Sequence, residues 1–305
     1  MTAHVEPHFF APAPEVSFHR SNVYLCLLVN QTDRAVRIID FRAGPSPEKR
    51  RVIETYAREH GIERLFTLVE RDEVSGWARL GFEREGNIPG YYKRSDAYVL
   101  GMLIDPNNVA GQSGTRPAAG VRAERIRSQH AVAEEQYQLA RKVARGWPKS
   151  NAPVRVSPLK SEEVARIRGQ LVKKKARALT SFEPFSRDGD RWYFSCTARG
   201  GHSVVVSIES QPCFNNAYLE LLTAPGSPKE AQFTIRALDA VTKLLKQQGI
   251  VSCFATAPVA EVELSAVFLE SGFRRSGLLS GHLRRGPARA DAFLWSRKLA
   301  LPDDG

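Results

Sequence analysis

One carboxylate stands in the middle of a predicted strand. The stretch 217–222 is apolar apart from Glu220. A buried carboxylate without a partner is costly, and such groups occur mainly where a shifted pKa serves proton transfer. Glu220 is therefore a candidate general base, unless it faces water on the polar side of its strand. Asp40, at the end of a similar strand near the N-terminus, is a candidate of the same kind.

The cysteines and histidines form no recognisable site. The four cysteines lie far apart in the sequence and show no Cys-x-x-Cys spacing; they are Cys26, Cys196, Cys213 and Cys253. Metal binding is therefore not predicted, and buried free thiols are the better interpretation. His202 and His282 could be site residues, but we expect them at the surface.

The chain carries the same landmarks twice, in the same order. Residues 81–92 and 272–283 share a Gly-Phe start, an arginine and two further glycines in register. A Ser-Pro turn recurs at 43–49 and 224–230. A Gly-Ile pair and an Asp-Ala pair follow in both halves. This agreement predicts a duplicated domain and not an array of short repeats.

Length and composition are those of a two-domain globular protein. The chain has 305 residues, of which 42% are hydrophobic and 25% charged, and about two domains are expected at this length. No apolar run approaches the roughly 20 residues that a membrane-spanning helix needs. The N-terminus has no basic start followed by an apolar stretch, which argues against a secretory signal. We expect a cytoplasmic protein, as a monomer or homodimer.

The net charge of +11 is concentrated in one segment. Residues 121–180 contain 15 Lys or Arg against 5 Glu. Such a segment attracts phosphate on a nucleotide, a nucleic acid or a membrane surface, although a solvated helical face is the plainer interpretation. Its only aromatic residues are Tyr137 and Trp147. The pattern therefore lacks the stacking residues of a single-strand binder, and it indicates at most contact with a phosphate backbone.

Periodicity and chain breakers predict the elements that position these residues. In the first half we expect strands at 23–29, 35–41, 64–69, 83–88 and 97–104 and helices at 47–60 and 73–80. A helix at 121–147 follows a linker at 105–120. In the second half we expect strands at 154–156, 191–197, 203–210, 217–222, 251–255, 273–282 and 290–299 and helices at 161–175, 228–248 and 261–271. Ser46 and Ser161 are the expected caps of the helices that follow them.

The two halves share an order of elements. The second half is βαβββαβαββ, and the first is ββαβαββ, the same order without its opening elements. Alternating strands and helices of this kind form an α/β sheet of mixed direction. We expect the two units to pack together, because the shorter one buries too little surface to be stable alone.

This order, with a short helix that ends in Gly-Phe before two final strands, resembles the GNAT family of acyl-CoA-dependent N-acetyltransferases. The segment 81–92 and the following Asp96-Ala97 look most similar to the β-lysine acetyltransferase branch. The resemblance implies an α/β fold of two GNAT-like mixed β-sheet domains. One is truncated, at 21–104, and one is complete, at 151–300. A flexible arm at 1–20 and a basic linker with a helix at 105–150 complete the expected organisation.

The resemblance also implies a site for acetyl-CoA. In this family the fourth strand separates from the fifth and admits the pantetheine arm, and the loop before the central helix presents N–H groups to the pyrophosphate. The matching cofactor-binding positions are Leu222, Thr223, Gly226, Ser227, Lys229 and Ala231. The loop departs from the family pattern, since Pro228 stands about where a basic residue is expected and Phe233 about where a glycine is.

The family's usual catalytic acid is a second departure. A tyrosine often stands four residues before the Gly-Phe glycine, where it reprotonates the leaving thiolate. Trp77 and Phe268 hold these positions here. We expect both to be aromatic anchors that pack the short helix on the sheet.

Two functions remain open. The first is an N-acetyltransferase that acts on a primary amine, either a small molecule or a protein lysine, with Glu220 as base in the second unit and a structural first unit. The second is a catalytically inactive protein of this fold that binds an acidic macromolecular partner, nucleic acid included. Binding that falls steeply with salt would favour the second, and salt-insensitive binding of an acyl-CoA would favour the first.

Overall fold

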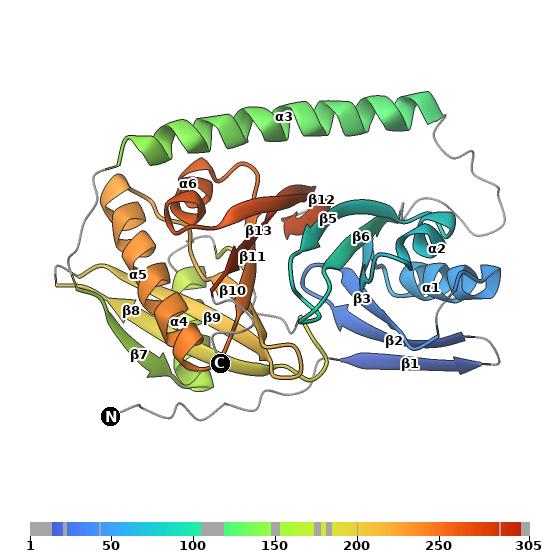
Figure 1. Ribbon diagram of the computed structural model, residues 1–305, viewed down its shortest axis with the longest axis horizontal. Coiled ribbons are helices and arrows are strands. Elements are labelled where there is room, and N and C mark those ends of the chain that lie inside the picture. Colours follow the sequence, from blue (N-terminus) through green and yellow to red (C-terminus); the bar gives the residue numbers. More distant parts are fainter. Residues whose placement is uncertain are drawn as a thin grey trace.

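A single β-sheet runs through both halves of the chain. In the computed structural model, its strands are hydrogen-bonded in the order β1-β2-β3-β4-β6-β5-β12-β13-β11-β10-β9-β8-β7. Figure 1 shows the first half, in blue and teal, beside the second half, in yellow to red. The structure describes residues 14–20, 23–42, 44–104, 119–147, 153–173, 178–180, 185–199, 201–286 and 288–299.

The first unit consists of β1 to β6 with two helices. Its elements are β1 (Glu15–Arg20), β2 (Val23–Asn30), β3 (Ala35–Asp40), α1 (Pro47–Glu59), β4 (Arg64–Val69), α2 (Val74–Arg79), β5 (Glu83–Ile88) and β6 (Ala97–Leu103). We expected residues 1–20 as a flexible arm, but Glu15–Arg20 pair antiparallel with β2. Val16 and Phe18 pack on the core of this unit, which explains why the strand forms. Residues 1–13 of the expected arm lie outside the described residues.

The second unit has the predicted order βαβββαβαββ. Its elements are β7 (Arg155–Leu159), α4 (Ser161–Lys173), β8 (Asp190–Thr197), β9 (Ser203–Gln211), β10 (Asn216–Leu221), α5 (Pro228–Gln247), β11 (Ser252–Pro258), α6 (Val262–Glu270), β12 (Arg274–Arg285) and β13 (Ala288–Lys298). The first unit lacks only the counterparts of β7 and α4, because β1 takes the place of β8. It is therefore one strand longer than predicted.

Two predicted helix caps differ in detail. Ser46 is extended and makes no side-chain capping bond, and Pro47 opens α1. Ser161 lies inside α4, where Glu163 accepts a hydrogen bond from the backbone N–H of Lys160 (2.9 Å). The carboxylate of Glu163 thus satisfies a donor at the helix start, a role that the sequence had suggested for the serine.

The predicted linker helix is α3 (Ala119–Arg145), which Figure 1 shows lying along both units. Near its C-terminal end it packs on α6, where Ala140 and Ala144 meet Ala266. Glu134 and Arg275 form an ion pair at 2.7 Å between α3 and β12. Residues 105–118 of the expected linker lie outside the described residues.

The duplication is present in the backbone as well as in the sequence. Strands β3 and β4 pair in parallel from Ala35 with Arg64, and β10 and β11 do so from Asn216 with Ser252. The turns that precede β3 and β10 each end in a non-glycine residue with positive φ, Arg34 (45°) and Asn215 (52°). Glycines with positive φ recur at matching landmarks: Gly61 and Gly249, Gly81 and Gly272, Gly90 and Gly281.

The two units join through equivalent strands. β5 and β12 pair antiparallel at Gly86 and Gly277, which hold the same place in the two copies. A Cβ on Gly86 would lie 2.7 Å from the Cα of Gly277, and a Cβ on Gly277 would lie 2.7 Å from the Cα of Gly86. Only glycine allows this approach. The expected packing of the two copies therefore occurs about an approximate two-fold axis.

A buried polar network crosses the same junction. Arg64, fully buried in β4, forms an ion pair with Glu85 and donates to the carbonyl of Ser280. Its Nε also lies 3.3 Å from Nδ1 of His282. We expected His282 at the surface, but it is buried, and burial together with Arg64 and Arg289 lowers its pKa well below the ordinary value. The imidazole is therefore neutral and can accept from Arg64.

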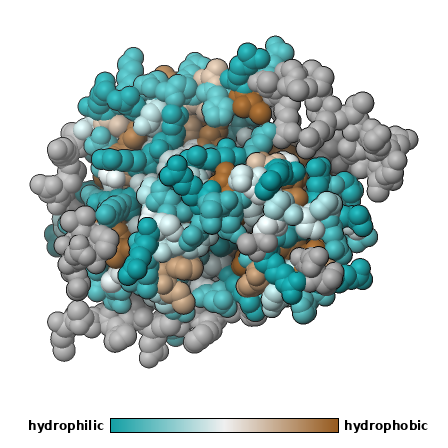
Figure 2. Space-filling view, turned by 45° about the vertical axis from the view of Figure 1, so that its right-hand side comes forward, coloured by the Kyte–Doolittle hydropathy of each residue, from teal (hydrophilic) through white to brown (hydrophobic). Residues whose placement is uncertain are grey.

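The buried hydrophobic residues form three main cores. One core lies under α5 and α6 and another under α1 and α2. A third, which includes Phe66, Tyr91, Tyr218 and Phe254, lies between the units. The surface in Figure 2 is mainly hydrophilic, with small hydrophobic patches. The inner faces of the two units therefore bury each other's apolar side chains.

Candidate functional site

The two central strands of the second unit separate at one end. β10 and β11 pair as far as Leu219 and Ala255, and pairing stops there. β10 continues to Leu221 and β11 to Pro258. Glu220 is the first residue of β10 beyond the paired part, and it stands where the strands part.

The side chain of Glu220 is buried and only partly satisfied. Its Oε1 accepts a hydrogen bond from Thr180, and Arg191 lies 4.0 Å from Oε2. Within the described residues Oε2 has no hydrogen-bond partner. Burial raises the pKa of Glu220 to about 7, against the opposing effects of Arg191 and Thr180. A carboxyl group with such a pKa can take up and release a proton at neutral pH.

A cavity of about 70 Å³ adjoins Glu220; we call it the second-unit cavity. The second unit contributes Glu220, Thr256 and Phe268 to its walls. The first unit contributes Asn30 and Asp33, at the turn between β2 and β3. The site of the second unit is therefore complete only when the first unit is in place.

The predicted cofactor residues gather around the start of α5. Ser227 caps this helix by accepting from the N–H of Glu230 (3.3 Å), and the Glu230 carboxylate accepts from the N–H of Gly226 (2.7 Å). Lys229 is exposed nearby. Of the other three, Leu222 donates its N–H to Val205 O (3.0 Å) and Ala231 donates its N–H to Ser227 O (2.9 Å). Thr223 is half-buried, directly after Leu222. The Glu230 carboxylate thus already accepts the backbone N–H that precedes this helix.

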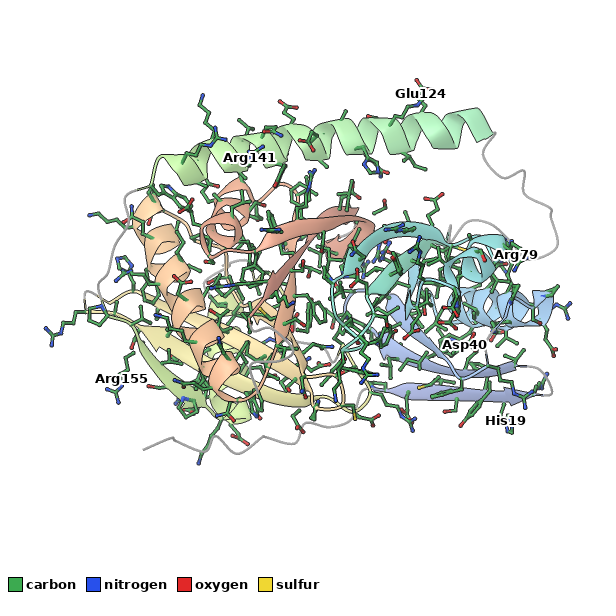
Figure 3. All side chains as sticks on the ribbon, in the orientation of Figure 1. His19, Asp40, Arg79, Glu124, Arg141 and Arg155 are labelled. Atoms are coloured by element: carbon green, nitrogen blue, oxygen red, sulfur yellow. The ribbon has the colours of Figure 1, made fainter. Side chains whose placement is uncertain are left out.

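The corresponding loop of the first unit is closed in a different way. Lys49 is buried in the first turn of α1 and pairs with Asp40. It also donates to the carbonyls of Arg42 and Gly44, each at 2.8 Å. Figure 3 shows Asp40 beside α1. By strand register Ile39, and not Asp40, corresponds to Glu220, so the two candidate acids point to opposite faces of the sheet.

A larger cavity, of about 420 Å³, lies at the matching place in the first unit; we call it the first-unit cavity. Pairing of β3 with β4 ends at Ile38 and Thr67, short of the ends of both strands. Gln211 and Phe214, at the turn between β9 and β10, line this cavity. That turn corresponds to the one between β2 and β3. Each unit therefore helps to close the cavity of the other.

The two aromatic residues at the tyrosine position are packing residues. Trp77 is 3% exposed and lies in the core under α1 and α2, edge-on to Phe82. Phe268 is 1% exposed and stacks on Trp295 with 5.7 Å between ring centroids. Neither ring carries a proton that a leaving thiolate could take, which agrees with the expectation of aromatic anchors.

Two residues of these sites are not among the residues predicted from the sequence. Thr180, which binds Glu220, lies in no predicted element. Arg37 lines both cavities and lies in the middle of β3, an otherwise largely apolar strand. A charge in the middle of a strand is the signal that identified Glu220, and it would have identified Arg37 as well.

The described residues show neither a metal site nor a membrane span. No group of three or more His, Cys, Asp or Glu among them could hold a metal ion. In the same residues no helix is both long and apolar enough to cross a bilayer.

Comparison with known proteins gives matches among solved structures. No model of a protein family matches the chain, and no curated protein does. A ribosomal-protein-S18-alanine N-acetyltransferase from Escherichia coli is similar at 14% identity and a TM-score of 0.37, over 50% of this chain and 98% of the other. A spermidine N-acetyltransferase from Vibrio cholerae is similar at 14% identity and a TM-score of 0.38, over 48% and 94%. The chain is a mixed α/β protein of two sheet units.

Proposed function

We propose that this protein is an acyl-CoA-dependent N-acetyltransferase that acts on a primary amine, with the second unit as the catalytic one. One observation carries the proposal. Glu220 is a buried carboxyl group with a pKa of about 7, and its Oε2 has no partner among the described residues where β10 and β11 separate beside a cavity. This combination suits a general base at neutral pH.

The proposed acetyl transfer needs few groups of the chain besides Glu220. The amine nitrogen forms a bond to the thioester carbonyl carbon, the carbon–sulfur bond breaks, and the thiolate leaves. Glu220 accepts the proton that the nitrogen gives up, through Oε2, which has no hydrogen-bond partner among the described residues. Thr180 donates a hydrogen bond to Oε1 and so fixes the orientation of the carboxylate, and Arg191 lies 4.0 Å from Oε2. The small cavity admits the tip of an amine and excludes bulk water from it.

The start of α5 fits the phosphates of acetyl-CoA if one side chain moves. Gly226 already directs its N–H at a carboxylate, and Lys229 is exposed close by. Glu230 lies on the loop surface in the position an incoming phosphate would take. Displacement of its carboxylate would leave a backbone donor, a helix N-terminus and a cation facing the phosphate.

The experiment is titration with acetyl-CoA by calorimetry, followed by release of free thiol with a panel of primary amines. We expect the unmodified protein and Glu220→Gln to bind acetyl-CoA alike, and only the former to release thiol above the uncatalysed rate. The rate should rise with pH through about 7 as Glu220 loses its proton. Glu54→Gln, which alters a carboxylate on α1, is the control. No heat with millimolar acetyl-CoA, or full activity of Glu220→Gln, would overturn the proposal.

Closure of both loops favours a second candidate, a catalytically inactive protein that binds an acidic macromolecule. Lys49 fills one loop and Glu230 the other. On α3, however, the exposed cations Arg127 and Arg141 alternate with the exposed acids Glu134 and Glu135. The described part of α3 is therefore no continuous basic stripe. Binding of duplex DNA that falls steeply with salt, without any binding of acetyl-CoA, would favour this candidate.

A further inference from the structure

The first-unit cavity has the size and lining of a ligand site. Its volume of about 420 Å³ lies within the range of small-molecule pockets. Aliphatic side chains from the separated strands form one wall, among them Ile39 and Leu68. Tyr91, Tyr92 and Phe214 form another, with ring centroids 4.9 to 5.7 Å apart. Nothing in the proposed acetyl transfer uses this cavity.

Arg37 brings an unneutralised positive charge to the cavity. Its guanidinium donates to the carbonyl of Phe185 (2.6 Å) and to the hydroxyl of Tyr91 (3.1 Å), which are both neutral groups. Its Nε is buried and has no partner within the described residues, and no carboxylate among them pairs with it. A guanidinium in such a setting favours an anionic partner, and a carboxylate matches its geometry best.

Gln211 supplies a second unsatisfied group. Its side chain is 7% exposed and lines the same cavity, and Oε1 has no hydrogen-bond partner in the described part of the chain. A buried amide oxygen without a partner is costly, and a ligand N–H would remove the cost.

Acidic groups lie at the same cavity as well. Glu73 lines it at the start of α2, and its pKa is raised by burial and by the neighbouring Asp40, Asp72 and Glu70. Asp188 is a further lining residue. The remaining lining cation, Arg187, is paired with Glu15 at 3.0 Å, and Asp40 is paired with Lys49. A plain carboxylic acid would therefore meet repulsion, whereas a positive group beside the carboxylate would be attracted.

From these features we propose that the first-unit cavity binds a free α-amino acid with an aromatic or large aliphatic side chain. Arg37 receives the carboxylate. Gln211 and the acidic groups around Glu73 receive the ammonium. The apolar side chain lies between the aromatic residues and the ends of the separated strands.

One cysteine makes the proposal testable at the site itself. Cys213 lines this cavity and is exposed, whereas the other three cysteines of the chain are buried. Alkylation by iodoacetamide therefore reports on this position. The experiment measures the alkylation rate of the full chain with increasing L-phenylalanine or L-leucine, together with calorimetric titration. We expect saturable protection of Cys213 and one bound amino acid per chain.

Two analogues test the pairing of charges in the unmodified protein. Phenethylamine lacks the carboxylate and 3-phenylpropionate lacks the ammonium, and we expect each to protect Cys213 at least about tenfold more weakly than L-phenylalanine. Equal protection by either analogue would overturn the assignment of an amino acid. No protection by L-phenylalanine or L-leucine at millimolar concentration would overturn the site.

Variants then assign the roles. Arg37→Gln and Gln211→Met should each weaken L-phenylalanine binding about tenfold or more. Arg34→Gln, on the same hairpin but outside the cavity, should leave it unchanged. Gln211→Met preserves the shape of the side chain, so it tests the site even if Arg37→Gln does not fold. Unchanged affinity of Gln211→Met for L-phenylalanine would show that the Gln211 amide does not bind the amino acid, and it would overturn the proposal.

Discussion

The two units place opposite charges at the same position of their loops. Counting from the shared Ser-Pro turn, Lys49 of α1 corresponds to Glu230 of α5. Lys49 is buried and donates hydrogen bonds to the carbonyls of Arg42 and Gly44. Glu230 is at the surface, and its carboxylate accepts a hydrogen bond from the N–H of Gly226. The first loop therefore points acceptors inward, where no phosphate could bind, whereas the second points a donor outward. Of the two loops, only the second therefore has a backbone donor in a position that suits the proposed contact with a phosphate.

The cavities of the two units differ in volume and in the charged residues that line them. The second-unit cavity is small and contains the candidate base. The first-unit cavity is six times as large and is lined by Arg37, which pairs with no carboxylate among the described residues. By register Arg37 corresponds to Tyr218, and Ile39 to Glu220. These two differences on one strand accompany the two proposed roles, proton transfer in the second unit and ligand binding in the first.

Breaking the closed loop of the first unit should have the largest effect. Lys49→Met leaves Asp40 as a buried carboxylate without its partner, and we expect a loss of about 3–5 kcal/mol in the free energy of unfolding. The double variant Lys49→Met with Asp40→Leu should recover most of it. Urea unfolding measures both. A loss below about 1 kcal/mol in the single variant would mean that the pair does not hold this loop.

Glu220 should make the stability of the protein depend on pH. Its pKa is about 7 in the folded state against an ordinary value of 4.5, so folding favours its protonated form. Stability from this group is present below pH 4.5 and is lost as the pH rises to about 7. Glu220→Gln removes the effect. Its unfolding free energy relative to the unmodified protein should rise by about 3 kcal/mol from pH 4.5 to pH 8. A constant difference across this range would contradict a raised pKa.

The junction between the units should respond alike on both sides. Gly86→Ala and Gly277→Ala each place a Cβ against the opposite backbone, and each should cost about 1–3 kcal/mol. Gly169→Ala in α4 meets nothing within 4 Å, and it should stabilise by up to about 1 kcal/mol. Thermal unfolding of the three variants gives the comparison. Very unequal losses at Gly86 and Gly277 would argue against the two-fold relation.

The smallest effect on stability should come from Glu230. Glu230→Gln weakens the hydrogen bond to Gly226 and the favourable charge at the helix start, at a cost of about 0.5–1 kcal/mol. The same change removes a negative charge from the proposed phosphate position, so acetyl-CoA should bind more tightly. Calorimetric titration with acetyl-CoA tests this. Weaker binding by the variant would place the phosphates elsewhere.

Local patterns predicted the elements well and the contacts between units poorly. Gly61, Gly81 and Gly249 ended helices as expected, because chain reversal is encoded within a few residues. The strand Glu15–Arg20 was missed because three prolines before it suggested a loose arm. Its pairing with β2 depends on Val16 and Phe18 reaching a core that lies further along the chain.

In the candidate sites, too, local patterns predicted single residues but not the contacts between distant parts of the chain. Glu220 could be identified because an acid in an apolar strand is a local signal. Its partner Thr180 comes from a segment outside every predicted element, and the contribution of Asn30 and Asp33 to its cavity depends on the pairing of Gly86 with Gly277. No local pattern predicts which two strands of separate units will meet. Gly86 and Gly277 recur in register in the sequence, but only the structure shows that they are needed because the two backbones meet there.

The pairing of β5 with β12 has a consequence for synthesis of the chain on the ribosome. β12 emerges long after β5, and until then β5 is an open sheet edge that other chains could extend. The strand carries Glu83, Arg84 and Glu85 in succession, and such charges discourage strand addition by a second chain. Glu85 later becomes buried beside Arg64. Its carboxylate also accepts a hydrogen bond from the N–H of Ser280 in the second unit (3.3 Å). A side chain suited to discourage strand addition in the nascent first unit therefore also joins the finished halves.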